Sequence, residues 1–110
     1  MKQYTTPEQT AKLIELGIVP KRIQSVSDEG KMLLELMGFP IGELIEMLPR
    51  KIGNGWYILE IKVYLEQWKV VYTDITNDSP RYYIVEDDLI DAIFNMAIKL
   101  KEEGVICGKQ

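Results

Sequence analysis

Four carboxylates gather in one short segment near the end of the chain, and these are the residues with the clearest chemical potential. Glu86, Asp87 and Asp88 are adjacent, and Asp91 follows one helical turn later. Carboxylate oxygens are the ligands that magnesium and calcium prefer, so a metal-dependent enzyme using carboxylates is one function to consider. The segment lacks the alternating oxygen ligands of a calcium loop. Acidic residues before an apolar stripe are typical of a helix N-terminus, so we expect a helix start and no bound metal.

Other groups that do chemistry are scarce. The chain has no histidine, which removes the commonest general base and the commonest zinc ligand. Its one cysteine, Cys107, has no histidine to activate it and no second cysteine to pair with, as expected in a reducing compartment. The turn sequence 53–55 is too short for a phosphate loop and precedes a strand. We therefore expect no catalytic residue, no cofactor and no enzymatic activity.

Aromatic residues are concentrated in the region of the expected strands. Because side chains alternate along a strand, some of these aromatics must face away from the helix that follows the sheet. Two N-terminal helices are available to cover that second face, and we expect them to do so. If the face is uncovered, its tyrosines and tryptophans are favoured for partner binding. The aromatic candidates are Trp56, Trp68, Tyr72, Tyr82 and Tyr83.

Composition and charge narrow the function classes. The chain has 110 residues, 46% of them apolar, as in a folded globular protein. Its net charge is −4, with the acidic excess in the second half, which disfavours a surface built for phosphate backbones. The first residues are polar, and no apolar run reaches membrane-helix length. We expect a cytoplasmic protein that binds no membrane.

Helix starts and stops divide the chain. Thr6 followed by proline and, three residues after Thr6, by Gln9 predicts a capping box and a helix over 7–16, with Gly17 ending it. Apolar spacing predicts a second helix over 41–48. The longest stripe predicts a final helix over 88–103, capped by Asp87 or Asp88 and ended by Gly104.

Between the last two helices, alternation and β-branched or aromatic residues predict three strands, over 56–65, 68–75 and 82–85. Short turns between them predict an antiparallel meander. The expected fold class is α+β, with the final helix packed on the sheet and the chain forming one domain over 1–110. Residues 105–110 are expected to be a flexible tail. Residues 31–37 suit a helical turn or a strand, and we favour the turn.

Three segments together resemble a known family. They are 6–17, beginning at the expected capping box, 44–49, and 91–100 within the final helix. In this order and spacing they resemble a family of short proteins, without an assigned activity, encoded by phages and mobile elements of gut Bacteroides-type bacteria. The resemblance implies a mobile genetic element as the setting. It implies no functional residues.

The expected function is that of a non-enzymatic protein-binding accessory protein, acting on a host or element-encoded partner. Its candidate surface combines the aromatic residues named above with the four carboxylates. A homodimer through the aromatic face is a close variant. Nucleic-acid binding through stacked bases, or mimicry of nucleic acid by the acidic surface, is the alternative class, and acidic residues such as Glu60 dilute the basic ones that direct binding needs.

Overall fold

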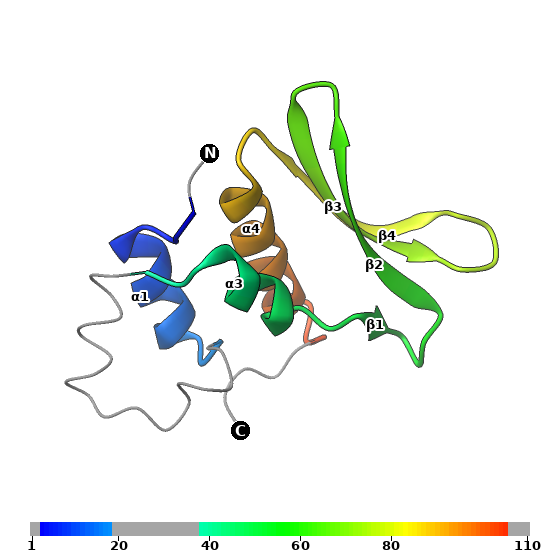
Figure 1. Cartoon of the computed structure of the whole chain (residues 1–110). Helices are drawn as coiled ribbons and strands as arrows, with labels where there is room; N and C mark the ends of the chain where they lie inside the picture. Colours follow the sequence, from blue (N-terminus) through cyan, green and yellow to red (C-terminus); the bar gives the residue numbers. More distant parts are fainter. Residues whose placement is uncertain (1–2, 19–37, 106–110) are drawn as a thin grey trace.

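The computed structural model describes residues 3–18 and 38–105, and in them the chain is an α+β protein (Figure 1). The predictions for 31–37 and 106–110, and the position of Cys107, lie outside the described residues. In chain order the elements are α1 (Pro7–Glu15), α3 (Ile41–Met47), β1 (Lys51–Ile52), β2 (Tyr57–Tyr64), β3 (Gln67–Asp74), β4 (Pro80–Glu86) and α4 (Leu89–Glu102).

Helix α1 begins and ends as its sequence predicts. The Thr6 side chain accepts from the Gln9 backbone N–H at 3.1 Å, and Gln9 Oε1 accepts from the Thr6 N–H at 3.0 Å, which completes the capping box. Gly17 has a φ of 76°, and the N–H of Ile18 donates to Leu13 O at 2.8 Å. This closing pattern leaves Ile18 buried against the last turn, as expected from a residue behind a helix-ending glycine.

Helix α4 is the longest element, and the prediction of a final helix over 88–103 is confirmed within one residue at each end. Asp88 caps it by accepting from the Ile90 N–H at 3.0 Å. At the other end Gly104 has a φ of 73°, and Val105 N–H donates to Leu100 O. Val105 packs against the core, so the expected tail does not include residue 105.

The sheet has four antiparallel strands in the order β1-β2-β3-β4, one more than predicted. The additional strand, β1, has only two residues, so no alternation of side chains was there to reveal it. Lys51 pairs with Ile58, and Leu59 N–H donates to Arg50 O at 2.9 Å. The expected meander is correct for the other three strands.

Strands β2 and β3 form a long hairpin, and β4 joins β3 along its other edge. Tyr64 pairs with Gln67, so Leu65 and Glu66 alone connect β2 to β3. Between β3 and β4 the register shifts by one residue: Tyr72 pairs with Tyr82, but Thr73 pairs with Pro80. The shift leaves Arg81 as an extra residue, which makes a β-bulge near the start of β4.

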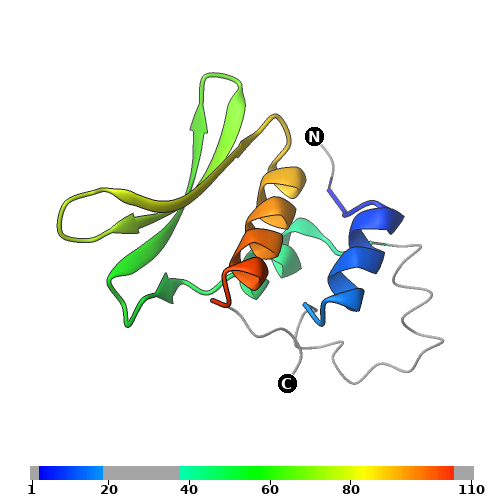
Figure 2. The same cartoon turned by 180° about the vertical axis from the view of Figure 1, so that it is seen from behind.

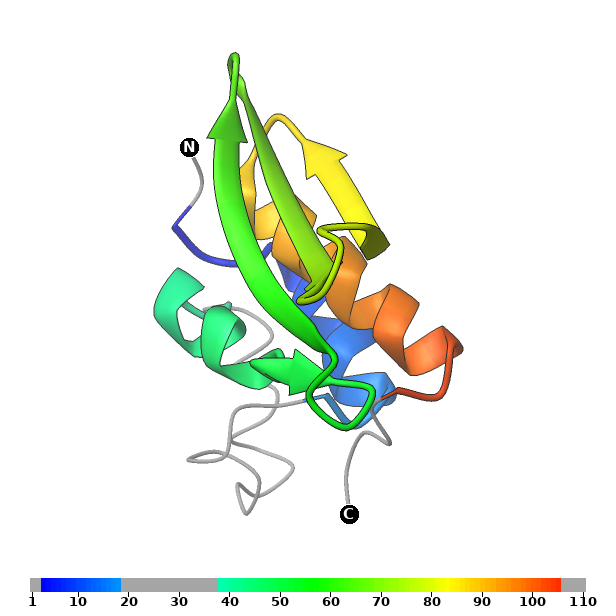
Figure 3. The same ribbon diagram turned by 90° about the vertical axis from the view of Figure 1, so that its right-hand side faces the viewer.

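All three described helices lie on the same side of the sheet (Figures 1 and 2). Helix α4 lies across β3 and β4, α3 packs on α4, and α1 lies farthest from the sheet (Figure 3). The prediction that the N-terminal helices cover the second face is therefore wrong for the described helices. The core fills the space between α4, α3, α1 and one sheet face, with fully buried residues Leu13, Phe39, Leu44, Val70, Tyr72, Ile90, Ile93, Met96 and Leu100.

The reason for this one-sided arrangement lies partly in polar contacts that join the helices to one another. Gln9 Nε2 donates to Asp91 Oδ1 at 2.8 Å, so the capping residue of α1 also ties α1 to the first turn of α4. Near it, Phe39 N–H donates to Thr5 Oγ1 at 2.8 Å, and that buried hydroxyl lies 2.5 Å from Thr10 Oγ1. These contacts attach α1 to the helical layer and leave it unavailable to the other face.

No helix within 3–18 and 38–105 has both the length and the apolar character needed to cross a membrane.

Candidate functional site

The structure separates the five aromatic candidates instead of bringing them to one surface. Tyr72 is fully buried on the helix side of β3, and its hydroxyl donates to Pro49 O at 2.6 Å. Burial raises the pKa of the Tyr72 phenol above its usual value, because the charged phenolate is poorly solvated there. Tyr72 is thus a core residue that fastens β3 to the segment after α3, and it is removed from the candidate surface.

Trp68 and Tyr82 also lie on the helix side, half-buried against the core. The Tyr82 ring has two cations near its faces: Arg81 Cζ lies 5.3 Å and Lys99 Nζ lies 5.8 Å from the ring centroid. Such contacts are attractive because the ring faces carry partial negative charge. Both aromatic side chains therefore already serve the packing between the sheet and α4.

Trp56 and Tyr83 are the two exposed members of the predicted set. Trp56 lies in the turn between β1 and β2, where its carbonyl accepts from Ile75 N–H at 3.0 Å. Tyr83 lies in the middle of β4 and points away from the helices, since its neighbours Tyr82 and Ile84 pack on the core. The two residues do not form a continuous aromatic surface.

The sheet face opposite the helices, here called the open face, has polar and exposed apolar side chains around one buried valine. Its side chains come from alternate positions of three strands: Ile58, Glu60, Lys62, Lys69, Val71, Thr73, Tyr83 and Val85. Val71 lies on this face and is not part of the core cluster, yet it is only 2% exposed. It is flanked directly by Glu60 on β2 and Tyr83 on β4, whose side chains account for its burial. A shallow hollow of about 400 Å³ lies over Val71, with Lys62, Lys69 and Asp78 in its lining.

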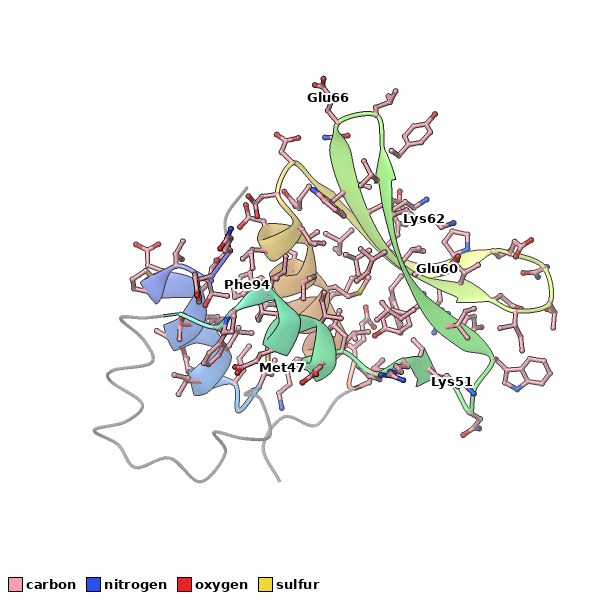
Figure 4. All side chains as sticks on the ribbon, in the orientation of Figure 1. Met47, Lys51, Glu60, Lys62, Glu66 and Phe94 are labelled. Carbon is pink, nitrogen blue, oxygen red and sulfur yellow. The ribbon has the colours of Figure 1, made fainter. Side chains whose placement is uncertain are left out.

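One pair of opposite charges lies on this face, between two residues of β2. Lys62 Nζ lies 3.5 Å from Glu60 Oε2, and Figure 4 shows both side chains on the side away from the helices. A hydrogen bond from Thr73 lowers the pKa of Glu60, and the positive charges of Lys62 and Lys69 lower it further. Lys69 Nζ also lies 5.5 Å from the Tyr83 ring centroid. Each of the two lysines therefore has a neighbour on the open face, Glu60 for Lys62 and the Tyr83 ring for Lys69.

The most exposed apolar residues lie at the end of the β2–β3 hairpin, which projects beyond the helices (Figures 1 and 2). Val63, Tyr64 and Leu65 are consecutive and 59%, 71% and 83% exposed. We call these three residues the hairpin tip. Glu66, the next residue, marks the end of the projection in Figure 4. A run of three exposed apolar residues is unusual unless it has a function.

Backbone geometry sets the tip apart as well. Leu65 has a φ of 58° and is the first of the two residues that connect β2 to β3. Glycine usually takes this position, since a side chain with positive φ crowds the backbone. The local strain is of the order of 1–2 kcal/mol, and strain of this kind is concentrated at functional sites.

The tip residues are not among those predicted from the sequence to bind a partner, although one feature of the sequence marks them. The segment after Ile61 contains a leucine in a two-residue turn where glycine or asparagine would be expected. What the sequence could not show is that the hairpin extends past the helical layer, so that Val63, on the helix side of β2 opposite Trp68, remains 59% exposed.

Each of the four carboxylates accepts a hydrogen bond around the start of α4. Asp88 caps the helix and Asp91 accepts from Gln9, as described above. Glu86 accepts from Asn95 Nδ2 at 3.0 Å, and Asp87 accepts from Gln67 Nε2 at 3.1 Å. Asp91 and Glu86 thus tie α4 to α1 and β4, and Asp87 ties the segment before α4 to β3. Across the described part of the chain, no group of three or more His, Cys, Asp or Glu residues is arranged to hold a metal ion.

Comparison with protein-family models, with curated proteins and with solved structures finds no match to this chain.

Proposed function

We propose that this chain is a non-enzymatic protein-binding module that contacts its partner mainly through the hairpin tip. The observation that carries the proposal is the consecutive exposure of Val63, Tyr64 and Leu65 at the end of a projecting hairpin. Tyrosine and leucine at such a position bury much apolar surface when they enter a pocket, and tyrosine is favoured at interface hot spots. From the family resemblance alone, we further propose that the partner is encoded by a host or by a mobile element.

The surroundings of the tip indicate what the partner looks like. Glu66 follows the tip directly, and Asp87 is joined to its base through Gln67. A pocket that receives the tip should therefore be apolar inside and carry lysine or arginine at its rim. The same acidic side chains repel phosphate groups, which disfavours an anionic membrane or a nucleic acid as the occupant.

Nucleic-acid binding through the open face has less support than protein binding. Lys62 and Lys69 lie on that face near Tyr83, an arrangement that base stacking would use. However, Glu60 is paired with Lys62, so little net positive charge faces outward. A gel-shift titration with single-stranded DNA and RNA at low salt is the test, and we expect no shift.

The tip is tested by a comparison of three immobilised proteins in lysate of the native host, treated with nuclease. The first is the wild-type chain, and the second carries Tyr64→Thr and Leu65→Gly, which remove the apolar tip but suit a strand end and a turn. The third carries Ile75→Ser, a control that removes another exposed apolar side chain, 54% exposed, far from the tip in the β3–β4 turn.

We expect at least one protein to be enriched by the wild type and the Ile75→Ser control and lost, by about tenfold or more, with the tip variant. Thermal unfolding of all three proteins shows that folding is retained. A captured protein that binds the tip variant as well as it binds the wild type would contradict the proposal, and so would the absence of any captured protein.

A further inference from the structure

Strand β4 forms one edge of the sheet, and its middle part has none of the features that usually protect such an edge. No strand of the described residues pairs with β4 on the side away from β3. Proline and a bulge interrupt the beginning of β4, at Pro80 and Arg81. From Tyr82 to Val85 the strand has only uncharged residues that favour β structure. An edge of this kind can accept another strand.

The hydrogen-bonding groups of this edge follow from the alternation in antiparallel sheets. In such a sheet, residues that bond one neighbouring strand alternate with residues that bond the other. Leu59 N–H donates to Arg50 O on the β1 side of β2. Leu59 pairs with Tyr72, so the backbone groups of Tyr72 are directed to β4, where they meet Tyr82. The groups of Tyr82 and Ile84 therefore bond β3, and those of Tyr83 and Val85 are directed to the outer edge.

We propose that the occupant of this edge is the β4 strand of a second copy of the chain, paired antiparallel about a twofold axis at Ile84. In this register Tyr83 of one copy faces Val85 of the other, and their outward groups form the hydrogen bonds of the pair. The two sheets then join into one continuous sheet, and the open faces of the two copies become contiguous.

Charge complementarity favours a second copy in this register. Arg81 lies three residues before Ile84 and Asp87 lies three residues after it. The twofold axis therefore places Arg81 of each copy opposite Asp87 of the other, the residue after β4, so that an opposite-charge pair lies beyond each end of the uncharged segment 82–85. Glu86, between that segment and Asp87, accepts from Asn95 within its own copy. A parallel pairing of two β4 strands would instead place like charges beside each other. Both residues are exposed. Within one copy Arg81 contacts the Tyr82 ring and Asp87 accepts from Gln67, and the pair between copies shares or replaces these two contacts.

This inference does not depend on the proposed partner, because the contact uses the β4 edge and not the hairpin tip. Pairing of one strand edge buries less surface than a stable dimer usually needs. We therefore expect weak self-association, with a dissociation constant of about 10⁻⁴ M, measured by sedimentation equilibrium of the purified full chain.

Two variants test the register. Arg81→Asp places like charges opposite each other and should weaken self-association by about tenfold. Arg81→Asp combined with Asp87→Arg restores the opposite-charge pairs with exchanged signs and should recover most of the lost affinity. Thermal unfolding of each variant confirms that the monomer is folded. Hydrogen exchange gives a separate measurement: the amides of Tyr83 and Val85 should become more protected as protein concentration rises.

Each alternative result would overturn the proposal. A wild-type chain that stays monomeric at its highest soluble concentration, with exchange at Tyr83 and Val85 independent of concentration, would show that no second copy binds the edge. A dimer that is unaffected by Arg81→Asp, or that the double variant fails to restore, would show that the copies meet through another surface.

Discussion

The two faces of the sheet are built from the same three strands but have opposite environments. On the helix side, Val70 and Tyr72 are fully buried under α4 and its neighbours. On the open face, one residue along the strand, Val71 is almost as buried, but its cover consists of flanking side chains from the adjacent strands. Burial therefore arises in two ways in this protein, through a packed layer of helices and through long side chains that lean over a single valine.

The comparison also indicates where binding is to be expected. The helix side is closed by apolar contact and by buried polar pairs, so it has little to offer a partner. The open face and the hairpin tip retain exposed apolar atoms, most of all at Tyr64 and Leu65. Exposed apolar patches that do not contribute to the packing of the monomer commonly mark sites of protein association.

The largest expected effect comes from equal truncations at two neighbouring valines. Val70→Ala should lower the free energy of unfolding by about 2 kcal/mol, because the helical layer cannot collapse into the space left behind. Val71→Ala should lower it by about 1 kcal/mol or less, because the side chains over it can move inward. Urea denaturation of both variants measures the difference. Equal losses would mean that the open face is packed as rigidly as the core.

A substitution at Gln9 tests how much its hydrogen bond to Asp91, which joins α1 to α4, contributes to stability. Gln9→Glu keeps the capping-box acceptor but replaces the amide donor, which lies 2.8 Å from Asp91, with a second carboxylate. We expect a loss of about 2 kcal/mol at neutral pH, part of which is recovered below about pH 4 as a proton is shared between the two groups. Gln9→Ala is the control, since its loss should not be recovered in acid.

The Tyr72 hydroxyl provides a test with a defined pH dependence. Tyr72→Phe should cost about 1 kcal/mol near neutral pH, because Pro49 O loses its donor. Burial raises the pKa of Tyr72 in the folded state above its unfolded value. The stability linked to this group is therefore present below about pH 10 and is lost as pH rises further. Denaturation between neutral and alkaline pH should show a shallower alkaline loss in the variant than in the wild type.

On the exposed side, one substitution is expected to stabilise the chain. Leu65→Gly removes the strain of a leucine with positive φ, and we expect a gain of about 0.5–1 kcal/mol after the greater flexibility of glycine in the unfolded chain is included. Thermal unfolding measures the change. If the variant is less stable than the wild type, the tip leucine contributes packing to the monomer and is not held for a partner.

The smallest effect should come from the ion pair on the open face. Lys62→Ala removes the cation 3.5 Å from Glu60, and since the two side chains are 54% and 34% exposed we expect a loss of less than about 0.5 kcal/mol. The loss should shrink further when the denaturation series is repeated at high salt. A larger, salt-independent loss would show that Lys62 contributes mainly by covering Val71.

The local elements were determined by the sequence itself. The capping box at Thr6 and Gln9, the glycines after α1 and α4, and the long apolar stripe of α4 each act within a few residues of the chain. For that reason their boundaries could be predicted without knowledge of the rest of the molecule. The three longer strands were predictable on the same grounds, whereas the two-residue β1 exists only because β2 provides a partner for it.

What only the tertiary structure decided is which side of each strand is covered and how far the cover extends. Tyr72 and Tyr83 look alike in the sequence, yet one is in the core and the other is exposed, because alternation fixes opposite faces without fixing where the helices lie. The placement of all described helices on one side depends on contacts between distant residues, such as Gln9 with Asp91. The same placement leaves the hairpin tip and the β4 edge exposed. The sequence marks an unusual turn at Leu65, but it does not show that either surface lies outside the helical cover.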